Sequence, residues 1–435
     1  MLIVYNIFFH IGFLFMLPVF LFKMISLKKY RAGLFQRLGL YPPTVAEKLK
    51  GSENIWIHGV SVGEIIAAQP LIALLKSKYP KFKFIISTTT NTGNAVAGKY
   101  AGKDDIVIYY PLDFPWVTNR VIDFIKPVFF VMLETELWPN LICGLGKKDI
   151  PVFLVNGRVS DRSFKGYMKI RAVLKIVFKY VSALLMQTEP DAEKMEQMGA
   201  PREKVSCAGS LKFESAMSDE PDTAELMKIA SEMGIESTNT VIIGGSTHNR
   251  EEELLLGIFK RLRPRCPGAK LIIAPRHPER FGAVINVVKK SGFPFSTRKR
   301  IKGFNTQGRR EKEIIVLDTI GELKKIYNFG SVVFVGKSMY AKGGQNILEP
   351  AAAGKAIIVG PHMENFRDIV KQFVDADACL MVNNEIELEE EITRLVMDKK
   401  ASRELGRRAK NLIIANCGAV SGIAEKIIKS VNKRI

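Results

Sequence analysis

Cysteine is scarce in this chain, and several common catalytic motifs are missing. The 435 residues include 5 Cys, which form no Cys-x-x-Cys pair. Neither a disulfide framework nor a zinc site follows from them, and a reducing compartment is the natural location. The sequence also lacks a His-Glu-x-x-His motif, a Cys/His cluster and a Gly-x-Gly-x-x-Gly after an expected strand. We therefore predict no metal site and no cofactor.

Acidic residues are outnumbered, with 44 Asp plus Glu against 64 Lys plus Arg, for a formal net charge of +20. Such a charge favours a polyanionic partner, which is nucleic acid, an anionic membrane or a phosphorylated substrate. No aromatic-interleaved basic stripe and no recognisable nucleic-acid module is present. We therefore expect no nucleic-acid partner.

Formal charge is absent from Leu2 to Phe22. As a helix at ~1.5 Å per residue this run spans ~31 Å, about the thickness of a bilayer core. No basic segment precedes it and no small-residue cleavage site follows it, so an uncleaved transmembrane anchor over residues 1–22 is favoured over a signal peptide. Asn6, His10 and Pro18 interrupt the run, which leaves a buried or interfacial helix as the alternative.

Basic residues follow the apolar run without any acid, at Lys23, Lys28, Lys29, Arg31 and Arg37. By the positive-inside rule, this cluster places the rest of the chain in the cytoplasm. The same cluster suits anionic headgroups, and a solvated basic linker is the alternative.

Short apolar runs alternate with helical patterns along the rest of the chain, as in an α/β fold with buried parallel strands. Predicted strands are 55–58, 83–88, 106–110, 128–133, 151–156 and 183–187, then 240–245, 270–275, 314–318, 331–336 and 355–360. The polar stretch 215–239 is the predicted linker, and the pattern from Ile386 onward is helical. Two doubly wound Rossmann-like domains, 23–214 and 240–400, facing each other across a cleft fit this order best, with terminal helices over 401–435.

Polar residues follow the first-half strands, where ligands bind in doubly wound sheets. Glu64 opens a helix in His-Gly-Val-Ser-Val-Gly-Glu and could be a general base, or it could simply complement the helix dipole. Glu134 ends the fourth strand, and Glu136 is expected in the first turn of the next helix. Lys212 lies just past a strand, and nothing local distinguishes it from a solvated charge.

The second half carries a moderately specific nucleotide-sugar pattern. Arg276, after Pro275, suits bidentate recognition of a phosphate or carboxylate, although an Arg that bonds loop carbonyls would look the same. Gly343 and Gly344 precede a helix expected near Asn346, so free backbone amides would face an anion there. Glu349 in its first turn could accept hydrogen bonds from a ribose.

The order of motifs then resembles a known family. HGVSVGE, LETELWPN, NGRVSDRSFKGY, GSLKF, GGSTH, APRHPER, DTIGEL and GGQNILEP are similar to the 3-deoxy-D-manno-octulosonic acid (Kdo) transferases of lipopolysaccharide synthesis. The similarity runs from about residue 28 to about residue 370, with the anchor before it. It implies the GT-B architecture: an acceptor-binding first domain, a donor-binding second domain, and C-terminal helices that pack back on the first.

The resemblance implies transfer of Kdo from CMP-Kdo to a lipid A precursor (lipid IVA), with inversion and without a metal. Glu64 matches the family's general base, and Glu134 and Lys212 match positions thought to stabilise the transition state. The residues that match the CMP-binding stretches are Pro275, Arg276, Ile320, Gly321, Glu322, Asn346, Ile347, Leu348 and Glu349. Gln345 and Ile347 stand where the family usually has His and Pro, which puts the strength of donor binding in doubt.

Two other functions remain open from the sequence: a GT-B enzyme that uses a UDP-sugar on a membrane lipid, and a non-catalytic membrane-surface protein of the same fold. A second basic stretch, 158–179, recurs at helical spacing and is opposed only by Asp161. It could meet the anionic membrane and guide a phosphorylated lipid acceptor, or be a solvated face. The basic cluster 298–312 is expected to be an exposed loop.

Overall fold

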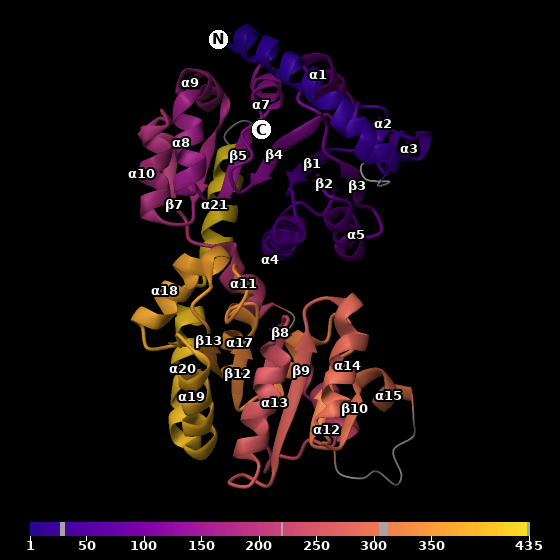
Figure 1. Cartoon of the computed structure of the whole chain (residues 1–435). Helices are drawn as coiled ribbons and strands as arrows, with labels where there is room; N and C mark the ends of the chain where they lie inside the picture. Colours follow the sequence, from indigo (N-terminus) through magenta and orange to yellow (C-terminus); the bar gives the residue numbers. More distant parts are fainter. Residues whose placement is uncertain (27–30, 219–220, 304–311, 433–435) are drawn as a thin grey trace. The chain divides into compact units, whose positions relative to one another are not determined.

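The computed structural model describes residues 1–26, 31–218, 221–303 and 312–432, and Figure 1 shows its elements. The chain forms two compact units: unit 1 comprises 1–215 and 416–435, and unit 2 comprises 216–415. Each unit is described by itself.

Unit 1 is built on a parallel seven-stranded sheet of order β3-β2-β1-β4-β5-β6-β7. Its strands are β1 (Asn54–His58), β2 (Lys83–Thr88), β3 (Ile106–Tyr109), β4 (Pro127–Leu133), β5 (Val152–Gly157), β6 (Ala183–Met186) and β7 (Val205–Cys207). Its helices are α1 (Leu2–Ser26), α2 (Leu34–Arg37), α3 (Pro43–Leu49), α4 (Val62–Lys78), α5 (Asn91–Tyr100), α6 (Pro115–Ile125), α7 (Pro139–Gly146), α8 (Asp161–Lys169), α9 (Arg171–Tyr180), α10 (Glu189–Gln197) and α21 (Ala419–Asn432), with a 3-10 turn at Arg202–Lys204. Helix α11 (Leu211–Met217) crosses the boundary to unit 2.

Apolar side chains cover both faces of this sheet, which is why its strands read as continuous apolar runs. Trp56 and Phe130 pack on one face with α6, α7, α9 and α10, whereas Ile55 and Ile57 pack on the other with α4, α5 and α21. We predicted that the helices of residues 401–435 pack back on the first domain; α21 belongs to unit 1, whereas α20 belongs to unit 2.

Unit 2 has a second parallel seven-stranded sheet, of order β10-β11-β9-β8-β12-β13-β14. Its strands are β8 (Thr240–Thr247), β9 (Ala269–Pro275), β10 (Phe295–Thr297), β11 (Ile314–Val316), β12 (Val332–Val335), β13 (Ala356–Val359) and β14 (Leu380–Met381). Its helices are α12 (Thr223–Met233), α13 (Glu251–Leu262), α14 (Phe281–Lys290), α15 (Arg298–Gly303), α16 (Leu323–Ile326), α17 (Leu348–Ala352), α18 (Arg367–Asp375), α19 (Glu385–Met397) and α20 (Lys399–Ala415), with 3-10 turns at Pro278–Arg280, Tyr327–Phe329 and Glu364–Phe366. The expected linker 215–239 therefore contains helix α12.

The predicted α/β class with two doubly wound parallel sheets is confirmed. In both sheets the chain runs outward in two directions from a central pair of strands, β1 with β4 and β8 with β12. Such a switch point leaves space beyond the carboxyl ends of the strands, where ligands of doubly wound folds bind. The candidate residues of each unit follow these strands or their neighbours.

One expectation about the basic clusters is wrong. Arg298 is not on an exposed loop: it opens α15, its side chain is 1% exposed, and it pairs with Glu232 at 2.8 Å and Glu322 at 3.3 Å. Residues 304–311 of this cluster lie outside the described part of the chain, as do Lys28 and Lys29 of the first cluster.

Candidate functional site

Glu64 lies in the first turn of α4, immediately past β1. Ser61 caps this helix, and the Glu64 carboxylate accepts hydrogen bonds from the Val60 N–H at 2.8 Å and from the Ser61 hydroxyl at 2.7 Å. The residue is only 8% exposed. Burial, followed by the negative charge of Glu134, raises the pKa of Glu64 to about 7, and the two hydrogen bonds oppose this rise. A carboxyl with a pKa near 7 is suited to accept a proton at neutral pH.

Glu134 follows β4 and is held in an unusual backbone conformation. Its φ of 55° lies in the left-handed region, which a non-glycine residue adopts only when its surroundings impose it. The Glu134 Oε1 atom lies 3.3 Å from Lys212 Nζ, and both side chains are half-buried. The structure thus brings together Glu64, Glu134 and Lys212, which are far apart in the sequence, at one edge of the unit 1 sheet.

The expectation for Glu136 is wrong, because this residue precedes the helix rather than lying in its first turn. Helix α7 begins at Pro139, and Glu136 lies in the connecting loop, where it accepts a hydrogen bond from Trp138 Nε1 at 2.9 Å. Burial raises its pKa, and the charge of Glu134 adds to the rise. Pro139 is the first residue of α7, a position that proline favours. The helix therefore starts three residues after Glu136, and no acidic residue lies in its first turn.

Sequence reasoning missed Asn156, which positions the segment that carries Lys212. Asn156 lies near the end of β5 with a φ of 55°, and its Oδ1 accepts the Leu211 N–H at 3.1 Å. Gln187 Nε2 donates to its backbone carbonyl at 2.9 Å. The signal that could have found it is an Asn at the end of an apolar run, since Asn tolerates positive φ better than most residues.

Replacing Lys212 tests the role of this ion pair. Lys212→Met is expected to lower kcat about 10- to 100-fold, because a hydrogen bond to a charged group is worth about 1.5–3 kcal/mol, and Lys212→Arg should retain part of the activity. The measurement is kcat at saturating donor and acceptor. Lys194→Met is the matched control, since Lys194 pairs with Asp161 at 2.7 Å and is equally exposed. An equal loss in the two Met variants would contradict the role.

Arg276 and Gln345 meet in unit 2. Arg276 is exposed just after Pro275, the last residue of β9, and its backbone N–H donates to the Thr247 carbonyl at 3.1 Å. Its Nε donates to Gln345 Oε1 at 3.2 Å. The residue that departs from the family pattern therefore orients the candidate phosphate ligand, and the alternative of an Arg that bonds only loop carbonyls is not what the structure shows.

The helix expected to begin near Asn346 begins two residues later. Helix α17 begins at Leu348 and is five residues long, too short for a substantial dipole. The Leu348 N–H already donates to Asn346 Oδ1 at 3.0 Å, and the Gly343 and Gly344 amides donate to Glu364 and to the Lys337 carbonyl. The Gly343, Gly344 and Leu348 amides therefore already have acceptors within the protein.

The remaining donor candidates divide by exposure. Ile347 and Leu348 are buried, so their side chains form core rather than a binding surface. Glu349 is half-buried, and burial raises its pKa while the charges of Lys324 and Arg276 oppose the rise. Ile320 is 77% exposed, next to Gly321, whose φ of 86° favours glycine.

Glu322 forms ion pairs with basic residues of its own unit. Its carboxylate pairs with Lys302 at 2.9 Å and Arg298 at 3.3 Å, and it accepts a hydrogen bond from the Thr319 hydroxyl. These hydrogen bonds and charges lower its pKa despite burial. These contacts fix the turn that carries Ile320 and Gly321.

Glu251 is a second residue that sequence reasoning missed. It is fully buried at the start of α13, and its carboxylate accepts the N–H groups of His248, Lys337, Ser338 and Met339 at 2.8–3.1 Å. These bonds fix the loop after β12, which in turn holds Gly344 through the Lys337 carbonyl. Glu251 thus supports the segment that carries Gln345 and Glu349.

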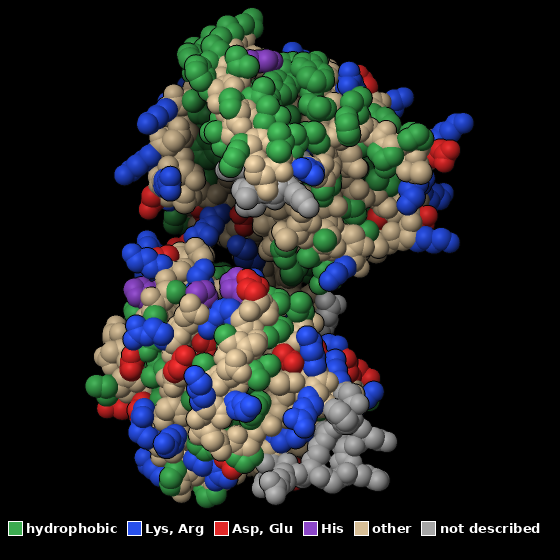
Figure 2. Space-filling view, turned by 45° about the vertical axis from the view of Figure 1, so that its right-hand side comes forward, with side chains coloured by type: hydrophobic (Ala, Val, Ile, Leu, Met, Phe, Trp, Pro, Cys, Tyr) green, Lys and Arg blue, Asp and Glu red, His purple; other side chains and the backbone are tan. Residues whose placement is uncertain are grey.

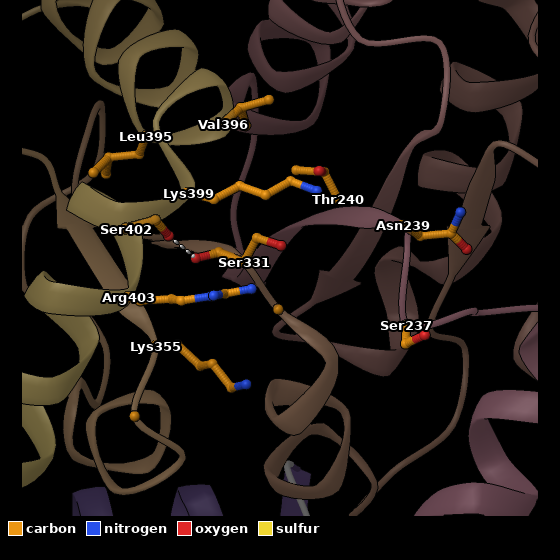
Figure 3. Close-up of a pocket in the computed structure, with 12 residues that line it drawn as sticks. Ser237, Asn239, Thr240, Ser331, Lys355, Leu395, Val396, Lys399, Ser402 and Arg403 are labelled. Carbon is orange, nitrogen blue, oxygen red and sulfur yellow. Dashed lines mark hydrogen bonds between the residues drawn. The ribbon is translucent and has the colours of Figure 1, made fainter.

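A cavity of about 190 Å³ in unit 2 does not coincide with any of these candidates. It is lined by Thr240 at the start of β8, by Ser331 just before β12 and by Lys355 just before β13, with Lys399 and Arg403 of α20 (Figure 3). These positions lie at the amino ends of the strands, opposite the edge at which Arg276 follows β9. The cavity is therefore separate from the predicted donor residues.

Two units with doubly wound parallel sheets, each with polar residues beyond the carboxyl ends of its strands, form a GT-B-like fold. In agreement, residues 296–412 match glycosyl transferases group 1. The structure of Anabaena HepE in complex with UDP covers 88% of this chain and 100% of its own at a TM-score of 0.56, and its 10% identity makes this a likeness of fold alone.

Sequence comparison identifies the family. Residues 32–215 match the family described as 3-deoxy-D-manno-octulosonic-acid transferase (kdotransferase). The 3-deoxy-D-manno-octulosonic acid transferase of Haemophilus influenzae is 34% identical over 406 residues, 92% of each chain, and that of Bordetella pertussis is 31% identical over 335 residues, 75% of each. The chain belongs to the Kdo transferase family, which confirms the resemblance.

Proposed function

We propose that this protein transfers Kdo from CMP-Kdo to a lipid A precursor, lipid IVA, in lipopolysaccharide synthesis. The observation that carries the proposal is the buried Glu64 carboxylate, with its pKa of about 7, beside the Glu134–Lys212 pair in a member of this family. Unit 1 is proposed to bind the acceptor and unit 2 the donor. The reaction requires no metal in this proposal.

In the proposed reaction, Glu64 takes the proton from an acceptor sugar hydroxyl as its oxygen attacks the anomeric carbon of Kdo. The bond from this carbon to the phosphate oxygen breaks, CMP leaves with the bonding electrons, and the anomeric configuration inverts. Lys212, which pairs with Glu134 at 3.3 Å, is proposed to supply a positive charge that stabilises the developing negative charge of the transition state.

Donor binding is proposed to involve Pro275, Arg276, the 320–322 turn, Asn346 and Glu349, with the buried Ile347 and Leu348 supporting this segment from the core. CMP-Kdo carries one phosphate, whose charge grows as the glycosidic bond breaks, and an oriented guanidinium can match that charge. Gln345 orients Arg276 in this chain. Glu349, close enough to feel the charge of Arg276, is proposed to accept hydrogen bonds from the ribose.

Arg276→Lys is expected to raise the KM for CMP-Kdo about 10- to 100-fold and to lower kcat less, since an ammonium loses the oriented fork of the guanidinium. Initial rates at a fixed acceptor concentration give both constants. Arg261→Lys is the control, because Arg261 is exposed and pairs with Glu389 on the surface of the same unit. An unchanged KM in Arg276→Lys would remove this residue from the donor site.

Calorimetric titration with CMP and with UDP tests the donor class. Binding of CMP with UDP at least tenfold weaker supports the proposal. The reverse order would favour a UDP-sugar enzyme, and binding of neither nucleotide would favour a non-catalytic protein of this fold.

We also propose that the protein resides at the cytoplasmic side of a bacterial inner membrane. Helix α1 has a mean hydropathy of 2.0, and it is long and apolar enough to be a candidate membrane span. The exposed cations of α8 and α9, among them Lys165, Lys169, Arg171 and Lys175, suit anionic headgroups and a phosphorylated acceptor.

A further inference from the structure

Helix α1 contacts unit 1 along one face over most of its length. Half-buried side chains recur every three or four residues, whereas the positions between them are exposed; the half-buried set is Leu2, Tyr5, Asn6, Phe9, Phe13, Leu17, Phe20 and Met24. This spacing is one stripe of an α-helix. In Figure 1, α1 accordingly lies along unit 1 rather than projecting from it.

The amino-terminal part of α1 is attached through buried polar groups. The Tyr5 hydroxyl donates to Asp113 Oδ2 at 3.0 Å, and Asn140 Nδ2 donates to Asn6 Oδ1 at 2.7 Å. Asp113 is 1% exposed and also accepts the N–H groups of Asn140 and Leu141. A bilayer core offers no such partners, so leaving these contacts would cost the polar groups of α1 their hydrogen bonds.

Aromatic packing extends this attachment. Phe9 and Phe13 make edge contacts with Phe114, at ring-centroid distances of 5.2 and 5.0 Å. Phe114 in turn stacks on Trp116 at 6.0 Å. The first half of α1 is therefore part of the surface of unit 1.

The carboxyl-terminal end of α1 returns to the same unit. Arg31 donates to the Met24 and Ile25 carbonyls of the last turn of α1 at 2.8 and 3.1 Å. The segment that follows is bonded to β3 and to the loop after β2. In that segment Gln36 accepts the Tyr109 N–H at 3.0 Å, and Arg37 donates to the Thr89 carbonyl at 2.6 Å. Between Phe13 and the Arg31 bonds, the half-buried Leu17, Phe20 and Met24 continue the stripe that faces unit 1.

The face of α1 that points away from unit 1 is apolar. It exposes Ile3, Ile7, Phe8, Ile11, Leu14 and Phe15, each 47–79% exposed, and Phe35 and Trp116 of unit 1 are also exposed at 68% and 51%. Figure 2 shows hydrophobic side chains gathered on this part of unit 1, with Lys and Arg at its margins. Arg120 lies over Trp116 at 5.5 Å, and α9, which contacts α1, exposes Arg171 and Lys175.

We infer that α1 does not cross the membrane but lies in its plane, with its apolar face and Trp116 in one anionic leaflet and both of its ends on the cytoplasmic side. A helix with an apolar face, a partnered polar face and a basic margin is suited to this interfacial position. The inference rests on the proposed membrane location and replaces the spanning anchor that the sequence favoured with its interfacial alternative. In this position α1 also fixes the distance between the leaflet and the candidate acceptor-binding residues of unit 1, because Asp113 joins α1 to the start of α7.

The inference can be tested by finding the side of the membrane on which Met1 lies. The full chain is given one protease-cleavable tag before Met1 and another after Ile435, and protease is added outside inverted inner-membrane vesicles, whose cytoplasmic face is outward. Both tags should be removed to the same extent, within about twofold. Protection of the amino-terminal tag until detergent is added would overturn the inference and restore the spanning anchor.

The same vesicles separate this inference from the proposed function. A protein that does not sediment with them would overturn both the membrane location and the in-plane helix. Absence of Kdo transfer with both tags cleaved would overturn the proposed reaction alone.

Depth measurement provides a second readout. Trp116 fluorescence should be quenched at least twofold more by lipids brominated near the headgroup than by lipids brominated near the chain ends. Trp116→Phe is the matched control, because it leaves Trp56 and Trp138 to report the background. Quenching that Trp116→Phe does not change would contradict insertion of this face.

Discussion

Glu64→Gln is expected to lower kcat about 10²- to 10⁴-fold, the range that general base catalysis supplies. Gln has the size of Glu and keeps one oxygen to accept from the Val60 N–H or the Ser61 hydroxyl, but it cannot take a proton. The measurement is product formation under single-turnover conditions with saturating CMP-Kdo. Activity within threefold of the wild type would leave Glu64 with only its role at the start of α4.

The pH dependence of the same residue gives a second test. Because the base must be ionised and its pKa is about 7, the rate should rise as pH increases through about 7 and then level off. The Ser61 hydrogen bond lowers this pKa, so Ser61→Ala should move the rise to higher pH. If the rate of both proteins rose instead near pH 4.5, the ordinary pKa of Glu, Glu64 would not be the base that limits the rate.

A stability measurement on Glu64→Gln distinguishes loss of catalysis from loss of the fold. The folded-state pKa of Glu64 lies above its ordinary 4.5, so the folded protein binds the extra proton and this contribution to stability is lost as pH rises from about 4.5 to about 7. Glu64→Gln removes the buried charge that remains above that window. Its unfolding midpoint at pH 8 should therefore equal or exceed that of the wild type.

Glu251→Ala is expected to reduce the stability of unit 2 by about 3–5 kcal/mol, because it leaves buried backbone N–H groups without an acceptor. The groups concerned belong to His248, Lys337, Ser338 and Met339. Glu251→Gln should lose less, since one of its terminal atoms still accepts. The loop after β12 would loosen as well, so the affinity for CMP should fall with the stability.

The distribution of tryptophan allows this loss to be assigned to one unit. All 3 Trp residues, at 56, 116 and 138, lie in unit 1, so their fluorescence follows unit 1 while far-ultraviolet circular dichroism follows both units. In Glu251→Ala the dichroism should show an early urea transition that the fluorescence lacks. Glu253→Ala, an exposed position in the same helix turn, is the control, and equal behaviour of the two variants would contradict the role of Glu251.

The sequence predicted most strands because strands buried on both faces are continuous apolar runs. It missed β7, β10 and β14, which are two or three residues long and lie at or next to the sheet edges, too short to show a pattern. Helix starts were less predictable. Both α7 and α17 begin later than an acidic or amide residue suggested, at Pro139 and Leu348.

The candidate site residues also differ in how far the local sequence pattern could predict them. Glu64, Glu134 and Arg276 could be singled out because they follow strands in a doubly wound fold, whereas Lys212 was singled out only by the family resemblance. Asn156, Glu251 and the buried Arg298 were not, since each acts on partners that are distant in the sequence. The orientation of α1 was not predictable for the same reason. Its apolar composition is that of a span, and contacts with residues distant in the sequence, Asp113, Asn140 and Phe114, show that one face is occupied by protein.

The most direct test of the account is to incubate the purified full-length protein with CMP-Kdo and tetra-acylated lipid A precursor in detergent and to weigh the lipid by mass spectrometry. The account predicts that the lipid gains at least one Kdo unit, that CMP is released in equal amount, that added chelator does not slow the reaction, and that Glu64→Gln gives little product. A lipid of unchanged mass, or one that gains a sugar only from a UDP donor, would contradict it.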